Sequence, residues 1–305
     1  MMEVYQDVWA RGQRAFAGVR ECASRYDAMR PVFDQFRRPF TVLDLGAHLG
    51  YFSFRLAEDY PGAVCVAVDD DPRLWDLCEA NAPIIHLQQR LTVDQLRTLG
   101  TCEHFDVVLA LNVLHHMDEA ALEAVMDLGD RVIVETPHPW ETMAHNGPQV
   151  EALYCDLVAH KPKLLTTTPS HLCNLRRPMF LFETPKDTIT RPYWDAPEGI
   201  WPGMLGITSS FDEKRLFILR KREDRPWMAG INLRTYERLS GIYPPRRQVA
   251  EWIRATPVEV HGDVRPWNFI LDPRGVHLID AGDTERAMDT DDHASLLAVA
   301  AEFGS

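Results

Sequence analysis

Short apolar runs alternate with amphipathic stretches over the first half of the chain. The runs cover residues 41–46, 63–69, 83–88, 105–112 and 131–137, and each is apolar throughout rather than at every second position. Continuous apolar runs predict strands that are buried on both faces, as in a parallel sheet. The segments between them, such as 51–60, 73–81 and 119–128, have the length of crossover helices. The pattern therefore predicts an α/β fold with helices on both faces of a parallel sheet.

Weaker patterns flank this alternation. Residues 3–38 carry apolar positions at roughly helical spacing, which predicts a helical lead-in over about residues 1–40. Later in the chain we expect a helix at 149–160. The apolar run at 215–221 is expected to form a strand that closes the sheet.

The length of 305 residues suits two units, one large and one small. After Arg222 the composition shifts to proline, tryptophan and short helical stretches. We therefore expect one domain over residues 1–222 and a small C-terminal appendage over residues 223–305.

The charge and cysteine content exclude several classes of protein. A formal net charge of −13 argues against nucleic-acid binding, because proteins that bind phosphates usually carry a basic face. The densest basic spots include Arg11, Arg14, Arg20 and Arg25, which we expect on solvated helix faces. Six cysteines without a CxxC pair favour a reduced, cytoplasmic protein without structural zinc. No apolar stretch reaches about 18 residues, so no membrane association is expected.

The first apolar run leads directly into a glycine loop. Asp44 and Gly46 end the run, Ala47 follows, and Gly50 precedes a predicted helix. Glycines at such a turn let the backbone pass close to a nucleotide-like ligand. The second run ends in Asp69, and an acid at that strand tip is placed to accept hydrogen bonds from two ribose hydroxyls.

At these residues the sequence resembles the class I S-adenosylmethionine (SAM)-dependent methyltransferases over about residues 40–222. The resemblance implies a Rossmann-like sheet with SAM as the cofactor. It also implies that Asp44, Gly46, Ala47 and Gly50 surround the methionine and adenosyl parts, and that Asp69 holds the ribose. Two alternatives are a dinucleotide dehydrogenase, although the loop lacks the GxGxxG spacing, and a Rossmann-like domain without a ligand.

The fourth apolar run ends in a cluster of polar residues. By the same resemblance Asn112 lies beside the methionine moiety, and His115 or His116 lies near the transferring methyl group. A histidine there is suited to remove the proton of a hydroxyl acceptor. The alternative is that these histidines cap a helix or pack in the core, and that alignment of the acceptor alone drives the reaction.

Aromatic and polar side chains mix in the regions where this family builds its acceptor pocket, and this mixture suits a small hydroxylated molecule or a glycan. These regions contain Tyr5, Trp9, Arg11, Arg14, residues 135–141, Tyr193 and Trp194. We therefore predict O-methylation of such an acceptor. Two alternatives are that these residues only pack a cover loop, and that the protein is a non-catalytic SAM-binding module whose tail recruits a partner.

The tail carries a second motif. His261-Gly262-Asp263, Asn268 and Asp280 have the spacing of the catalytic loop of aminoglycoside-phosphotransferase-like kinases. The resemblance implies Asp263 as the base and Asn268 and Asp280 as Mg²⁺ ligands. The segment lacks a glycine-rich loop and is too short for a nucleotide-binding lobe. It is therefore either a relic or part of a truncated methyltransferase–kinase fusion, like those that cap O-antigen polysaccharides, with the missing lobe in a longer chain or a partner protein.

Overall fold

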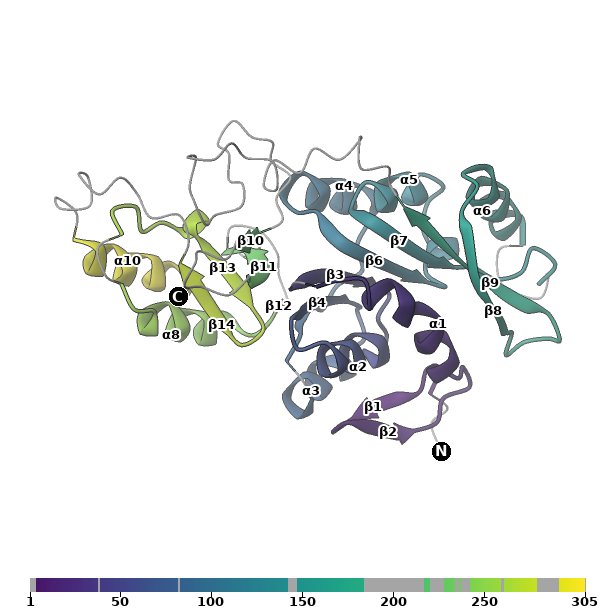
Figure 1. The fold of residues 1–305 in the computed structure, drawn as a ribbon, viewed down its shortest axis with the longest axis horizontal. Helices are drawn as coiled ribbons and strands as arrows, with labels where there is room; N and C mark the ends of the chain where they lie inside the picture. Colours follow the sequence, from purple (N-terminus) through teal and green to yellow (C-terminus); the bar gives the residue numbers. More distant parts are fainter. Residues whose placement is uncertain are drawn as a thin grey trace.

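The computed structural model describes two packed parts of the chain (Figure 1). The residues that it describes are 4–37, 39–81, 83–141, 147–183, 217–219, 228–233, 236, 242–258, 261–278 and 291–304. None of the helices in these ranges is long and apolar enough to cross a membrane.

A central sheet with the strand order β12-β5-β4-β3-β6-β7-β9-β8 forms the larger part. Its parallel strands are β3 (Phe40–Leu45), β4 (Ala63–Val68), β5 (Ile85–Leu87), β6 (Phe105–Leu111) and β7 (Gly129–Glu135). Its antiparallel strands are β8 (Lys163–Pro169), β9 (Arg176–Glu183) and β12 (Ile242–Tyr243). Every residue of β3, β4, β5 and β6 is buried, as the continuous apolar runs predicted. The predicted Rossmann-like α/β fold is confirmed.

Helices cover both faces of this sheet, and each face has its own hydrophobic core. One face carries α1 (Ala23–Phe33), α2 (Tyr51–Asp59) and α3 (Arg73–Ala80). The other face carries α4 (Val93–Cys102), α5 (Ala121–Met126) and α6 (Gly147–Ala159). The crossover helices predicted at 51–60, 73–81 and 119–128 correspond to α2, α3 and α5.

The prediction of a helical lead-in was wrong over the first half of that segment. Residues 8–16 form a hairpin of β1 (Val8–Ala10) and β2 (Gln13–Phe16). Arg11 and Gly12 have φ angles of 53° and 75°, and two successive left-handed residues make the tight turn that reverses a hairpin. Such a turn is incompatible with a helix, so the helix begins only at α1.

The expectation that residues 215–221 close the main sheet was also wrong. β10 (Phe217–Leu219) instead pairs with β11 (Met228–Asn232). Together with β13 (Phe269–Asp272) and β14 (Gly275–Leu278) they form an antiparallel sheet of their own. The antiparallel pair β8 and β9 takes the closing position in the main sheet. An apolar run predicts a strand but does not identify its partner.

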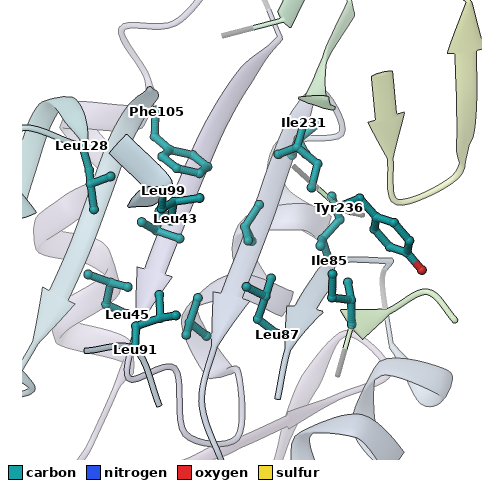
Figure 2. Packing of buried hydrophobic residues seen from close by; sticks show 14 of the residues in the cluster. Leu43, Leu45, Ile85, Leu87, Leu91, Leu99, Phe105, Leu128, Ile231 and Tyr236 are labelled. Atoms are coloured by element: carbon teal, nitrogen blue, oxygen red, sulfur yellow. The ribbon is translucent and has the colours of Figure 1, made fainter. Parts of the chain in front are cut away.

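The C-terminal part is packed onto the first part rather than separated from it. Ile231 and Tyr236 belong to the same core as Ile85 and Leu87 of β5 (Figure 2). The backbone N–H of Asn232 also donates to the side chain of Glu103 at 3.0 Å. Helices α8 (Arg246–Ala255) and α10 (Asp292–Gly304) pack against each other beyond this contact. The C-terminal part thus shares the hydrophobic core on one face of the main sheet.

Candidate cofactor site

A cavity of about 390 Å³ opens where β3, β4, β5 and β6 end. The carboxyl ends of parallel strands are the usual ligand crevice of open α/β sheets, and the volume suits a small-molecule site. The lining combines backbone loops with polar and apolar side chains. It consists of Tyr5, Gln6, Leu45, Gly46, His48, Val68, Asp69, Asp70, Gln89, Arg90, Leu91, Leu111, Asn112, Val113, His116 and Met117.

The glycine loop contributes Gly46 and His48 to the lining of this cavity. Gly46 has a φ angle of 68°, and a Cβ atom there would lie 2.9 Å from Cγ2 of Val113. Its backbone N–H donates to the carbonyl oxygen of Val68 at 2.9 Å, which joins the loop to the end of β4. Only glycine satisfies both the left-handed backbone and the close contact. The strand-to-loop turn therefore brings the backbone to the cavity surface at Gly46 and His48.

Three of the predicted cofactor residues do not line the cavity. Asp44 is buried beneath the loop and accepts a hydrogen bond from the Ser53 hydroxyl at 2.7 Å. Burial raises the pKa of Asp44 to about 6. Ala47 and Gly50 lie in the same loop but face the core around α2. The structure thus gives these residues contacts that support the loop.

Asp69 lies at the end of β4, as predicted, and lines the cavity. Its Oδ2 accepts the backbone N–H of His48 at 2.6 Å, and its Oδ1 accepts that of Asp71 at 2.9 Å. These two bonds fix the carboxylate, and each oxygen keeps acceptor capacity for a further donor. Gln89 and Arg90 line the cavity just after β5.

The two neighbouring histidines face different spaces. His116 lines the cofactor cavity, whereas His115 lines a separate cavity of about 260 Å³ beside α5 and α6. Their rings are 3.9 Å apart. Burial lowers the pKa of His115 to about 3, so its imidazole is neutral near pH 7. Of the two predicted catalytic histidines, only His116 reaches the cofactor cavity.

The neutral state of His115 predicts a pH dependence of stability. The unfolded chain protonates this histidine below a pKa of about 6.5, but the folded protein resists protonation down to about 3. Its stabilising contribution is therefore complete above about pH 6.5 and declines as the pH falls. The stability difference between the native protein and His115→Gln should shrink by about 2 kcal/mol between pH 7 and pH 5. Urea unfolding at both pH values measures this, and a constant difference would contradict it.

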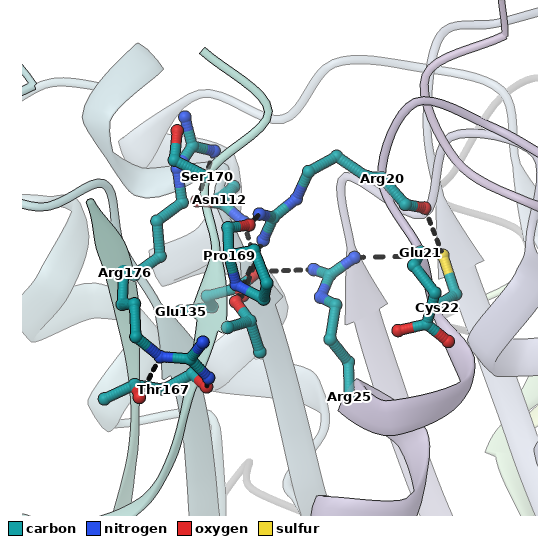
Figure 3. Close-up of polar contacts among 12 residues, drawn as sticks. Arg20, Glu21, Cys22, Arg25, Asn112, Glu135, Thr167, Pro169, Ser170 and Arg176 are labelled. Carbon is teal, nitrogen blue, oxygen red and sulfur yellow. Dashed lines mark hydrogen bonds and ion pairs between the residues drawn. The ribbon is translucent and has the colours of Figure 1, made fainter. Parts of the chain in front are cut away.

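A fully buried carboxylate, Glu135, lies beside the cofactor cavity at the end of β7 (Figure 3). Nη2 of Arg20 donates to Oε1 at 2.7 Å, and Nη2 of Arg25 donates to Oε2 at 2.5 Å. The hydroxyl of Thr168 and the amide Nδ2 of Asn112 donate to the same carboxylate. Glu135 thus connects residues 20–25 to β8 and to the end of β6.

The expectation that Arg20 and Arg25 are solvated was wrong. Their exposed fractions are 2% and 1%, and both pair with Glu135. A buried carboxylate needs such partners, because an unpaired charge in the core is strongly unfavourable. Arg11 and Arg14 are exposed as expected, but on the hairpin rather than on a helix.

A second buried ion pair completes the environment of Asn112. Arg177 donates to the Glu141 carboxylate through Nε at 3.0 Å and Nη2 at 2.6 Å. Its Nη1 donates to Oδ1 of Asn112 at 3.2 Å. The amide of Asn112 is therefore held at both ends, by Glu135 and by Arg177. In the sequence Arg177 follows another arginine, and no motif distinguishes it from an arginine on the surface.

The predicted acceptor residues lie in different surroundings. Tyr5 lines the cofactor cavity, and its ring contacts that of His48 with 5.9 Å between centroids. Trp9 instead packs on α2, where its Nε1 donates to Glu58 at 2.9 Å. Trp140 is 75% exposed. Tyr193 and Trp194 lie outside the described residues.

The kinase-like motif forms an ordered loop in the C-terminal part. Nδ2 of Asn268 donates to Oδ2 of Asp263 at 2.8 Å, and Arg265 pairs with the same carboxylate. The buried Asp292 accepts the backbone N–H of His261 at 2.6 Å and so anchors the start of the loop. Asp280 lies outside the described residues. Within the described ranges no cluster of histidine, cysteine or carboxylate side chains could hold a metal.

Comparison with known proteins adds independent information on this arrangement. Residues 42–135 match the family model of a methyltransferase domain. Two Escherichia coli proteins, each described as the O-antigen chain terminator bifunctional methyltransferase/kinase WbdD, are 26% identical over 200 residues. The match covers 59% of this chain but only 27% of theirs. A solved structure of WbdD with a kinase inhibitor has a TM-score of 0.50 at 20% identity, covering 99% of this chain and 93% of that chain.

Proposed function

We propose that this chain is a class I SAM-dependent methyltransferase, which transfers the methyl group of SAM to an oxygen of a hydroxylated small molecule or glycan. The observation that carries the choice of acceptor is the polar and aromatic lining of the cavity beside Asn112. Tyr5 and His116 supply a flat apolar surface and hydrogen-bonding groups in the same place, as a hydroxylated ligand requires. The description of WbdD as an O-antigen chain terminator supports a glycan.

The cavity residues fit the cofactor and leave a defined set of tasks to this chain. When bound, SAM supplies an electrophilic methyl group on a sulfonium. Asp69 offers its carboxylate to the ribose hydroxyls, and the doubly held Asn112 amide orients the methionine part. His116 accepts the proton of the acceptor hydroxyl as that oxygen attacks. Alignment of the acceptor in the cavity supplies the rest of the rate enhancement.

We also propose that residues 223–305 are the kinase-like part of a larger bifunctional arrangement. The chain spans about a quarter of the length of the curated relatives that it matches. The Asp263–Asn268 contact is the geometry that a phosphotransferase loop would use, which favours this second function over a simple linker. A missing lobe, in a longer chain or a partner protein, would have to supply the nucleotide site.

A transfer assay tests the proposed methylation. The protein is incubated with SAM labelled in its methyl group and with fractions of bacterial glycans and small polyols, and labelled products are identified by mass spectrometry. We expect an O-methylated glycan or polyol, and His116→Gln should slow its formation by about 10²-fold or more. His115→Gln is the matched control because its ring faces the other cavity. Exclusive N-methylation, or equal rates for His116→Gln and the native protein, would contradict the proposal.

A further inference from the structure

The second cavity, of about 260 Å³, lies beside the cofactor cavity and is lined by α6 and by the residues that lead into α5. Both cavities share the turn that follows β6. His116 faces the cofactor cavity from this turn, whereas Leu114 and His115 face the second cavity, and Met117 lines both. The methyl transfer proposed above assigns no role to this second space.

One face of α6 forms a wall of the second cavity. Gln149, Ala152, Leu153 and Asp156 line it, and they occupy positions i, i+3, i+4 and i+7 of the helix. Residues with this spacing lie on the same side of a helix. Leu157 is fully buried in the core on this face of the sheet. The helix is thus held by one side while a second side faces the cavity.

Much of the remaining lining is apolar. Leu114, Ala121 and Leu122 are buried members of the same core, and Met117 and Leu153 pack against it. Covering apolar surface in a concave space is favourable, because it removes that surface from water. The second cavity therefore suits a ligand with a hydrocarbon or aromatic portion.

The charged side chains of this lining are acidic. They are Asp118, Glu119 and Asp156, and the described lining includes no lysine or arginine. Each of these carboxylates is exposed, so an ion pair with any single one of them is weak. Charges of one sign around a concave space add their potentials, however, and this raises the local concentration of cations. The charged part of a ligand is therefore expected to be positive.

His115 supplies a buried polar atom to the same lining. Its exposed fraction is 8%, and its Nδ1 atom is buried without a hydrogen-bond partner among the described residues. Leaving such an atom unsatisfied is costly, so a ligand group is expected to reach it. Because burial lowers the pKa of His115, the imidazole is neutral near pH 7, and a neutral imidazole can present Nδ1 as an acceptor. An N–H donor of the ligand matches this atom.

These features together define one class of ligand. An apolar body that ends in a protonated amine would cover the apolar lining, bring positive charge to the three carboxylates and offer an N–H to His115. We infer that the second cavity is a binding site for a small organic amine, separate from the cofactor cavity. Because Met117 lines both cavities, the bound amine lies against a side chain that also borders the cofactor cavity.

Titration with 2-phenylethylamine tests this site without measuring methyl transfer. Binding is followed by NMR of the full chain with labelled methionine methyl groups, in the absence and presence of saturating S-adenosylhomocysteine. We expect a saturable shift of the Met117 signal in both conditions. The alcohol 2-phenylethanol has the same apolar body without the charge, and it should bind at least about tenfold more weakly.

Two variants locate the amine within the cavity. Replacing Asp118 and Asp156 together by asparagine should weaken 2-phenylethylamine by about fivefold or more. Glu151→Gln is the matched control, because Glu151 is an exposed acid on α6 that does not line the cavity, and it should change the affinity by less than about twofold. Ala152→Phe fills the cavity and should abolish amine binding while the other methionine signals stay native.

The opposite results would overturn the inference. Equal affinities for 2-phenylethylamine and 2-phenylethanol would show that the carboxylates do not select a cation. Equal losses in Glu151→Gln and in the double variant would reduce the effect to general attraction by an acidic surface. Binding that survives Ala152→Phe, or that S-adenosylhomocysteine displaces, would place the amine outside the second cavity. The absence of saturable amine binding to the native protein would remove the site altogether.

Discussion

Replacing Glu135 by alanine is expected to lower the free energy of unfolding by about 3–5 kcal/mol, because it leaves two buried arginines without their common partner. Glu135 accepts hydrogen bonds from four side chains, and its own exposed fraction is 1%. Urea unfolding of Glu135→Ala at pH 7 measures the loss.

A surface ion pair supplies the comparison for this variant. Glu251 pairs with Arg247 at 3.2 Å on α8, but the two side chains are 57% and 88% exposed. Solvent screens such a pair, so Glu251→Ala should cost less than about 1 kcal/mol. Similar losses of unfolding free energy in the two variants would show that the buried Glu135 network stabilises the fold no more than an exposed ion pair does.

Asp69 is the second residue with a large expected effect. In the proposed function Asp69 is the charged acceptor of the ribose hydroxyls, so its removal should cost about 1.5–3 kcal/mol in cofactor binding. Calorimetry should therefore find that Asp69→Ala weakens S-adenosylhomocysteine by roughly tenfold to a hundredfold. Part of this loss comes from the loop, because Asp69 also holds the backbone N–H of His48.

The neighbouring acid provides the control for Asp69. Asp70 lines the same cavity but is exposed, so water already satisfies much of its carboxylate. We expect Asp70→Ala to change the affinity by less than about threefold. A large loss in Asp70→Ala with little change in Asp69→Ala would move the ribose contact to Asp70.

The central sheet was predictable because its determinants are local. Strands such as β3 and β6 are apolar throughout, and the polar residues that follow them must come together at one edge of a parallel sheet. This rule identified Gly46, Asp69 and Asn112, which all line the cavity. It could not separate His115 from His116, because their directions depend on one turn of 3-10 helix, Leu114–His116.

The polar network was not predictable, because its members are distant in sequence. Arg25 and Glu135 are separated by 110 positions, and nothing near Arg25 distinguishes it from a solvated arginine. The pattern of apolar residues reports burial of strands and helices, whereas charged groups are buried only where the fold supplies their partners.

The short strand β12 has a consequence for any shortened form of this protein. Its residues Ile242 and Tyr243 pair with Leu87 and His86, and so occupy the outer edge of β5. A chain cut near residue 222 would leave that edge with free N–H and C=O groups, above apolar side chains that the C-terminal part normally covers. Uncovered edge strands of this kind pair with other copies. Separating residues 1–222 from the C-terminal part should therefore produce aggregation, visible as high-mass species in light scattering, rather than a soluble domain.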